Sequence, residues 1–120
     1  MSKSTLVIGA STNPERYSNM AMKLLHEYQH PVFAFGKKSG QVDEIVIETE
    51  QIQYPFLNTI TLYLNPTIQK DLYSYILSLH PRRIIFNPGA ENEELEKLAT
   101  AHGIQCIEAC TLVLLKTNQY

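Results

Sequence analysis

Short apolar segments alternate with segments of helical spacing, and this alternation constrains the fold more than any other feature of the sequence. The apolar segments cover residues 5–8, 32–35, 44–48, 59–64, 83–87 and 104–108. Right-handed helical crossovers between parallel strands need about a dozen residues, and most of the intervening segments are long enough to supply one. We therefore predict an α/β fold with a Rossmann-like, doubly wound parallel sheet of five to six strands. The expected strand order is 3-2-1-4-5-6, with helices on both faces and three layers in all.

Three helices are expected between these strands. The first follows the loop of residues 9–14, and the second begins at Asn65 and Pro66, which suit the N-cap and the first helical position. The third begins after Asn92, with acidic residues in its first turn, and ends at Gly103. The apolar face of the first helix is predicted to contain Tyr17, Ala21, Leu24, Leu25 and Tyr28.

Length and composition are those of one ordinary globular domain covering residues 1–120. Hydrophobic residues make up 44% of the chain and charged residues 18%. Each half of the chain carries five basic and six acidic residues, so we expect no nucleic-acid partner. The apolar segments are much shorter than the roughly 18 residues of a membrane span, so no membrane partner is expected. The two cysteines do not form a disulfide framework, and a cytoplasmic protein is predicted.

Ligands of an open parallel sheet bind beyond the carboxyl ends of the strands, where the strand order reverses. Here that point lies between the first and fourth predicted strands. In the loop after the first strand, Gly9 permits a sharp turn, and the small Ala10 and Ser11 let a phosphate approach the main chain. A complete G-x-G-x-x-G motif is absent, so the same residues also fit a tight strand-to-helix turn that binds nothing.

The turn after the second strand narrows the choice of ligand. NAD sites usually have an acidic residue here, whereas this chain has Lys37 and Lys38 between Gly36 and Gly40. Two lysines favour a phosphate carried on a ribose, as in NADP or coenzyme A (CoA). The alternative interpretation is a solvated polar loop without a ligand.

Three segments together resemble the small stand-alone CoA-binding proteins. They are residues 9–18 (GASTNPERYS), residues 86–92 (FNPGAEN) and residues 108–111 (EACT). The domain of these proteins is similar to the CoA-binding domain of the succinyl-CoA synthetase alpha subunit, and the resemblance covers nearly the whole chain. The phosphorylated histidine of that synthetase lies in a second domain, which has no counterpart in these 120 residues. The resemblance therefore implies binding of CoA or an acyl-CoA, and it gives no support for ligase activity.

The resemblance also implies a cofactor site built from three places in the chain. They are the first loop, the turn after the second strand and the start of the helix after the fourth strand. The residues carried over are Gly9, Ala10, Ser11, Thr12, Arg16, Lys37, Lys38, Asn65 and Pro66.

No catalytic residue and no metal ligand is predicted. The four histidines, His26, His30, His80 and His102, do not combine with other residues into a zinc spacing or a Ser-His-Asp or Cys-His arrangement. Cys106 is expected in the core. Cys110 follows the last strand, and no basic residue lies between residues 103 and 115, so we expect an unreactive thiol.

Three interpretations remain open from the sequence. The first is a binding module for CoA or an acyl-CoA that uses the Gly9-Ala10-Ser11 loop and has no catalysis of its own. The second is an NADP-binding protein or small oxidoreductase. The third is an interaction protein with a vestigial site. A protein partner or a homo-oligomer is compatible with these interpretations.

Overall fold

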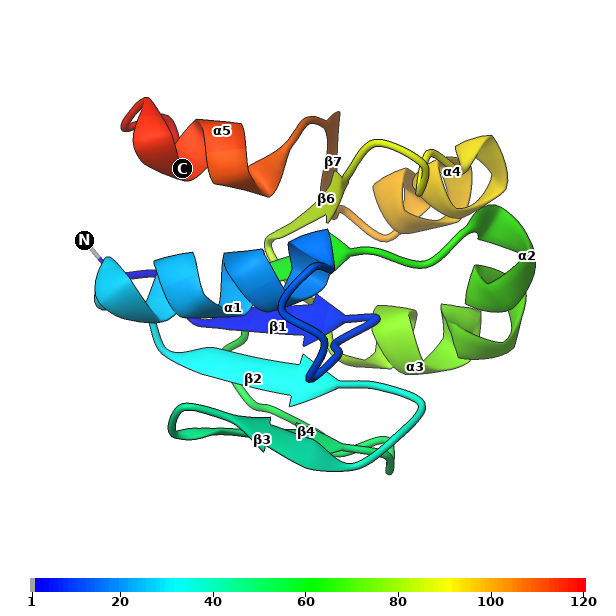
Figure 1. The fold of residues 1–120 in the computed structure, drawn as a ribbon. Helices are drawn as coiled ribbons and strands as arrows, with labels where there is room; N and C mark the ends of the chain where they lie inside the picture. The colour runs from blue at the N-terminus through cyan, green and yellow to red at the C-terminus, as the bar shows by residue number, and fades with distance from the viewer. Residues whose placement is uncertain (1) are drawn as a thin grey trace.

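Seven strands form one sheet in the computed structural model, which describes residues 2–120 (Figure 1). The strands are β1 (Thr5–Ile8), β2 (Val32–Phe35), β3 (Gly40–Val42), β4 (Ile45–Glu48), β5 (Thr59–Leu62), β6 (Arg83–Phe86) and β7 (Gln105–Glu108). Their order is β3-β4-β2-β1-β5-β6-β7. Every neighbouring pair is parallel except β3 and β4, which are antiparallel.

The predicted parallel order is confirmed, and one strand was missed. The six predicted strands correspond to β4-β2-β1-β5-β6-β7, in the expected order. The additional strand, β3, forms a hairpin with β4, and the turn between them has Asp43 in the left-handed region, with φ of 52°. The predicted strand order put the segment of β4 at the edge of the sheet. This is wrong, because β3 lies outside β4. The sequence of β3 is Gly-Gln-Val, which has too little apolar character to show the strand.

Helices cover both faces of the sheet and make the predicted three layers (Figure 1). They are α1 (Tyr17–Glu27), α2 (Pro66–Gln69), the 3-10 turn η1 (Lys70–Leu72), α3 (Tyr73–Ser78), α4 (Glu93–Ala101) and α5 (Thr111–Lys116). The core on one face joins α1 and α5 to the sheet, and the core on the other face joins α3 and α4. Helix α5 was not predicted, because residues 112–115 are a continuous apolar run without helical spacing. Within residues 2–120, no helix combines the length and the apolarity that crossing a membrane requires.

Three of the four residues of strand β1 are apolar, because both faces of the strand are covered. Leu6 and Ile8 belong to the core beneath α3 and α4, and Val7 belongs to the core beneath α1 and α5. All four residues of the strand are fully buried. This burial on two sides is the reason that the strand shows no alternation of polar and apolar residues.

The two predicted asparagine caps are confirmed. The Oδ1 atom of Asn65 accepts a hydrogen bond of 3.0 Å from the main-chain N–H of Ile68, and Pro66 occupies the first helical position. The Oδ1 atom of Asn92 accepts one of 3.2 Å from the N–H of Leu95. Each cap satisfies a main-chain donor that has no partner within its helix, which fixes where the helix begins.

The predicted apolar face of α1 is wrong at its two ends. Tyr17 is 69% exposed and Tyr28 is 42% exposed, whereas Met22 and Ala21 are fully buried. The residues of α1 that face the sheet are Ser18, Asn19, Ala21, Met22 and Leu25. Most of these side chains are small or polar, which lets the helix pack closely on the sheet. Tyr17 and Tyr28, at the two ends, lie outside the contact between helix and sheet.

Substitution of Met22 by alanine is expected to destabilise the fold by about 2–5 kcal/mol, because it opens a cavity under α1. The matched control is Met20→Ala on the same helix, where the side chain is 37% exposed. We expect the control to change the free energy of unfolding by at most about 1 kcal/mol. Urea denaturation of both variants measures the difference, and equal effects would contradict the observed face of α1.

Candidate functional site

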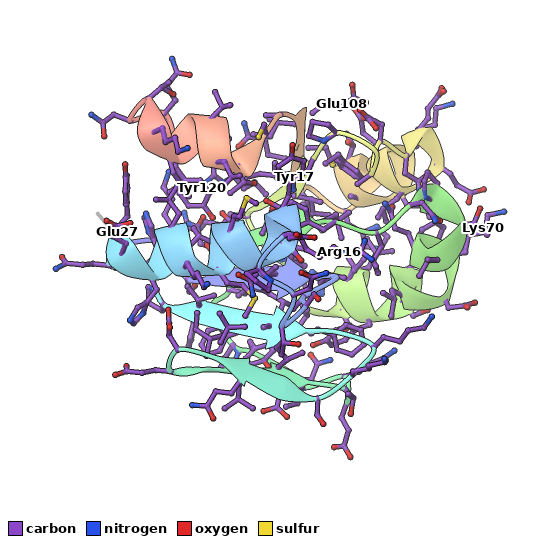
Figure 2. All side chains as sticks on the ribbon, viewed as in Figure 1. Arg16, Tyr17, Glu27, Lys70, Glu108 and Tyr120 are labelled. Atoms are coloured by element: carbon purple, nitrogen blue, oxygen red, sulfur yellow. The ribbon has the colours of Figure 1, made fainter. Side chains whose placement is uncertain are left out.

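The strand order reverses between β1 and β5, which are adjacent and parallel. The chain leaving β1 enters α1 on one face of the sheet, and the chain leaving β5 enters α2, η1 and α3 toward the other face (Figure 1). The two loops therefore diverge at the carboxyl edge of the sheet, where the sequence predicted a ligand. In Figure 2, Arg16 and Tyr17 mark the start of α1 above this edge.

The loop after β1 is anchored to the end of β2 by two main-chain hydrogen bonds. The N–H groups of Gly9 and Ala10 both donate to the carbonyl oxygen of Phe35, each over 3.0 Å. Gly9 has a φ of +94°, and a Cβ atom there would lie 3.1–3.2 Å from atoms of Leu64 and Tyr63. Gly9 and Ala10 thus build the turn, and their amides are already paired. A phosphate at this loop has to use other donors.

The remainder of the loop is braced by its own polar groups. The Oδ1 atom of Asn13 accepts a 3.0 Å bond from the N–H of Glu15, and its carbonyl oxygen accepts a 3.1 Å bond from the N–H of Arg16. The N–H of Asn13 in turn donates to Oγ of Ser11 over 3.0 Å. These bonds fix the path of the chain into α1. They leave the N–H groups of Thr12, before this segment, and Tyr17, after it, without a partner.

Several donors at the start of α1 have no acceptor among residues 2–120. They are the N–H groups of Ser11, Thr12, Tyr17, Ser18 and Asn19. Arg16 occupies the N-cap, and its side chain makes no capping bond. Unpaired N–H groups at a helix N-terminus, where the helix dipole is positive, favour an anion. The arrangement therefore fits a phosphate group of a nucleotide cofactor.

Asn19 was missed in the sequence and ties α1 to this loop. Its side chain is 2% exposed, and its Nδ2 atom donates to the carbonyl oxygen of Ser11 over 2.9 Å. Its Oδ1 atom is buried and has no partner in the described part of the chain. A buried amide in the first turn positions the helix N-terminus directly against the loop. The sequence offered one indication of this role: Asn19 is a polar residue on the same helix face as Ala21 and Met22.

The turn after β2 packs directly on the loop after β1. A Cβ atom on Gly36 would lie 2.5 Å from the carbonyl oxygen of Ala10, and one on Gly40 would lie 2.5 Å from Cγ2 of Thr12. Lys37 and Lys38 are exposed between these two glycines. The structure therefore brings the lysine turn beside the first loop, as the sequence predicted, and explains why both flanking residues lack a side chain.

The loop after β5 is held by a buried glutamine that sequence reasoning missed. Gln69 is fully buried, and its Nε2 atom donates to the carbonyl oxygens of Leu64 over 2.7 Å and Ala90 over 2.8 Å. Its Oε1 atom accepts a 2.8 Å bond from Nδ2 of Asn92. Asn65 uses one acceptor position of its Oδ1 atom as the helix cap, and its Nδ2 atom makes no hydrogen bond within residues 2–120. Asn65 and Pro66 accordingly shape this side of the edge.

Asn87 makes a second buried junction beneath the edge. Its Nδ2 atom donates to Oγ1 of Thr61 over 2.7 Å and to the carbonyl oxygen of Leu62 over 2.9 Å. Its Oδ1 atom accepts a 2.9 Å bond from the N–H of Thr111, at the start of α5. The hydroxyls of Thr61 and Thr111 are also hydrogen-bonded, at 2.8 Å. One side chain thus joins β5, β6 and α5.

The two cysteine thiols and the phenol of Tyr63 are partly buried, and Cys106 lies in the first half of β7, away from the carboxyl edge. Cys110 occupies the N-cap of α5 and is half-buried. Cys106 is also half-buried, and burial raises the pKa of its thiol. Burial likewise raises the pKa of Tyr63, whose hydroxyl oxygen is buried. Within residues 2–120, no three His, Cys, Asp or Glu side chains are grouped so that they could hold a metal ion.

Comparison with known proteins shows the family of the chain. Residues 3–116 match the family described as the CoA binding domain. The chain belongs to this family. The resemblance seen in the sequence is thereby confirmed, although no curated protein matches the chain in sequence.

Solved structures share the fold of this CoA-binding domain. The crystal structure of an uncharacterized protein is 41% identical, with a TM-score of 0.98 over 100% of this chain and 99% of that one. A hypothetical protein from Pyrococcus horikoshii OT3 is 21% identical, with a TM-score of 0.87 over 97% and 83% of the two chains. The dinucleotide-forming acetyl-coenzyme A synthetase 1 of Ca. Korarchaeum cryptofilum is 12% identical. Its TM-score is 0.72 over 90% of this chain and 26% of the synthetase.

Substitution of Gly36 by alanine is expected to destabilise the domain by about 1–3 kcal/mol, because the new Cβ meets the main chain of Ala10 and a loop has to shift. Gly40→Ala is the matched comparison and should cost less, since the atom it meets belongs to the exposed side chain of Thr12. Adding Thr12→Ser to Gly40→Ala removes the crowding methyl group and should restore stability. Thermal and urea unfolding of the three variants check this order, and a Gly36→Ala variant as stable as wild type would contradict the contact.

Proposed function

We propose that residues 1–120 act as a single binding module for CoA or an acyl-CoA and have no catalysis of their own. One observation carries the proposal: the unpaired N–H groups of Ser11, Thr12 and the first turn of α1 lie where the strand order reverses. Membership of the CoA-binding domain family supports CoA as the source of the phosphate.

The diphosphate of the cofactor is assigned to these main-chain donors. Hydrogen bonds to a charged group contribute about 1.5–3 kcal/mol each, so two or three amides outweigh an exposed lysine–phosphate pair of about 1 kcal/mol at most. Arg16 adds a positive charge at the same helix start. Gly9 and Ala10 contribute through the shape of the turn, since their own N–H groups are bonded to Phe35.

The phosphate on the ribose of CoA is assigned to Lys37 and Lys38. The turn that carries them contacts the first loop through Gly36 and Gly40 and contains no acidic residue. A carboxylate at this place would favour the ribose hydroxyls of NAD and repel a phosphate. Asn65 and Pro66, at the start of α2, complete the proposed site on the other side of the reversal point.

Calorimetric titration tests the identity of the ligand. We expect CoA to bind at least about tenfold more tightly than NAD, which corresponds to about 1.4 kcal/mol. NADP and dephospho-CoA are the informative comparisons, because each shares one part of CoA. Binding of NADP that equals or exceeds that of CoA, or NADP-dependent turnover, would favour the alternative of an NADP-binding protein or small oxidoreductase.

The double variant Lys37→Ala/Lys38→Ala should lose most of the preference for CoA over dephospho-CoA while retaining binding of both. The effect should be modest and should shrink with added salt, because both lysines are exposed. The matched control is Lys97→Ala/Lys116→Ala, which removes the same charge from α4 and α5 and should keep the preference. If the Lys37/Lys38 variant discriminates between the ligands as well as wild type does, these lysines do not bind the ribose phosphate.

A further inference from the structure

Strand β7 ends the sheet beyond β6, and within residues 2–120 no strand lies on its outer side (Figure 1). It has four residues, as many as the central strands β1, β5 and β6. It pairs with β6 along its inner side, and α4 packs on one of its faces. None of its residues belongs to the proposed CoA site. Figure 2 shows Glu108, the last residue of the strand, at the upper rim of the molecule.

The main-chain groups on the outer side of β7 belong to Cys106 and Glu108. The N–H groups of Gln105 and Ala109 donate to carbonyl oxygens of the β6 segment, over 3.0 Å and 3.2 Å. Successive residues of a strand direct their N–H and carbonyl groups to alternate sides, so those of Cys106 and Glu108 point away from β6. The edge therefore offers two donors and two acceptors to another strand.

The side chains of β7 do not protect this edge. Exposed edges of monomeric proteins commonly carry proline, lysine or a bulge that prevents pairing with another chain. The sequence of β7 is Gln-Cys-Ile-Glu, and its pairing with β6 is regular at all four positions. Cys106 and Ile107 point to opposite faces of the sheet, and both are only half-buried. Apolar surface is thus left uncovered on each face beside the free main-chain groups.

The outer side of β7 is complementary to itself. In an antiparallel pair, residues that exchange two hydrogen bonds alternate with residues that exchange none. If two copies of β7 run antiparallel about a two-fold axis at Ile107, Cys106 of each copy lies opposite Glu108 of the other. These are the residues whose N–H and carbonyl groups point outward, so all of the outward groups are paired.

The same register places compatible side chains opposite one another. The two Ile107 residues are neighbours across the axis, with Cα atoms about 4.5 Å apart, and cover the apolar surface that each leaves half-exposed. Glu108 lies opposite Cys106, and Gln105 lies opposite Ala109. No two like charges are therefore directly opposed, an arrangement that would weaken the pair.

Helix α4 adds complementary charge beside the strand. The sulfur of Cys106 lies 3.9 Å from the carbonyl oxygen of Glu96 and 4.0 Å from Oγ1 of Thr100, so this side of α4 lies over β7. A two-fold axis at the strand makes the two α4 helices antiparallel, which turns Glu96 of each copy toward Lys97 of the other. Lys97 is available for this, because its 3.2 Å ion pair with Glu93 is exposed and therefore weak.

We propose that this edge binds a second copy of the chain, and that two copies pair antiparallel through β7 about a two-fold axis at Ile107. The sheet then continues from one copy into the other. Both copies use the same strand, so the contact closes on itself and assembly stops at a dimer. The carboxyl edges of the two sheets face opposite directions, so the proposal does not depend on what binds there.

Disulfide trapping tests the register. In a Cys106→Ser/Cys110→Ser background, Ile107→Cys should give a cross-linked dimer on mild oxidation. The expected Cα separation of about 4.5 Å lies within the range of about 4.4–6.8 Å that a disulfide spans. The matched control is Gln105→Cys, on the same strand and exposed. Its two copies would be about 14 Å apart along the strand, so it should stay monomeric on a non-reducing gel.

Sedimentation equilibrium tests the hydrogen bonds. Wild type should dimerise reversibly, and Glu108→Pro should weaken the dimer at least about tenfold, because it removes one outward donor from each copy. The N–H group of Glu108 points away from β6, so the pairing within each chain is kept. Glu108→Ala is the matched control, which loses the same side chain, keeps the donor and should dimerise as wild type does. Circular dichroism checks that both variants are folded.

Three results would overturn the proposal. The first is a wild-type protein that remains monomeric up to about 1 mM. The second is cross-linking of Gln105→Cys as readily as of Ile107→Cys, which would show random collision or another register. The third is a folded Glu108→Pro variant that dimerises as strongly as wild type. If Glu108→Pro does not fold, the two cysteine variants decide the question alone.

Discussion

The carbonyl oxygen of Phe35 accepts hydrogen bonds from two successive amides, and the geometry of the carboxyl edge depends on this junction. The N–H groups of Gly9 and Ala10 both point at it, which turns the chain away from β1 immediately after the strand ends. The positive φ of Gly9 makes the turn possible, and Gly36 leaves room for the carbonyl of Ala10. The free amides of Ser11 and Thr12 are therefore one and two residues beyond the hydrogen-bonded junction between β1 and β2.

Buried side-chain amides extend this rigidity across the sheet. Asn19, Gln69 and Asn87 are each at least 98% buried, and each bonds to at least one main-chain carbonyl oxygen of a neighbouring loop or strand. Removing one partner of such a bond leaves a buried polar group unpaired, at a cost of about 1–3 kcal/mol. The loops at the edge are thus held from beneath by groups that never reach the solvent. Loops held in this way would lose little conformational entropy on binding a ligand.

The sequence predicted the parts of the molecule that are set by local patterns. Strand order followed from apolar segments and crossover lengths, and the helix starts at Asn65 and Asn92 followed from capping chemistry. The missed features depend on contacts between distant residues. Strand β3 exists because it pairs with β4, and the exposure of Tyr17 depends on how closely α1 approaches the sheet.

The candidate site was predicted at the level of loops, and its atoms were not. The lysine turn does lie beside the first loop, because Gly36 and Gly40 pack against Ala10 and Thr12. Sequence alone did not show that the amides of Gly9 and Ala10 are already bonded, or that Asn19, Gln69 and Asn87 hold the edge together. A hydrogen bond between residues far apart in the chain leaves no periodic trace, so these roles appear only in three dimensions.

The short hairpin of β3 and β4 also determines how the molecule meets other copies of itself on that side. A long, flat and apolar edge strand would offer its free N–H and carbonyl groups to another chain and promote aggregation. Here the outermost strand has only three residues, Lys38 lies two residues before it, and Asp43 follows it in a tight turn. The short strand that follows the lysine turn therefore also limits the sheet edge that is open to pairing with another chain.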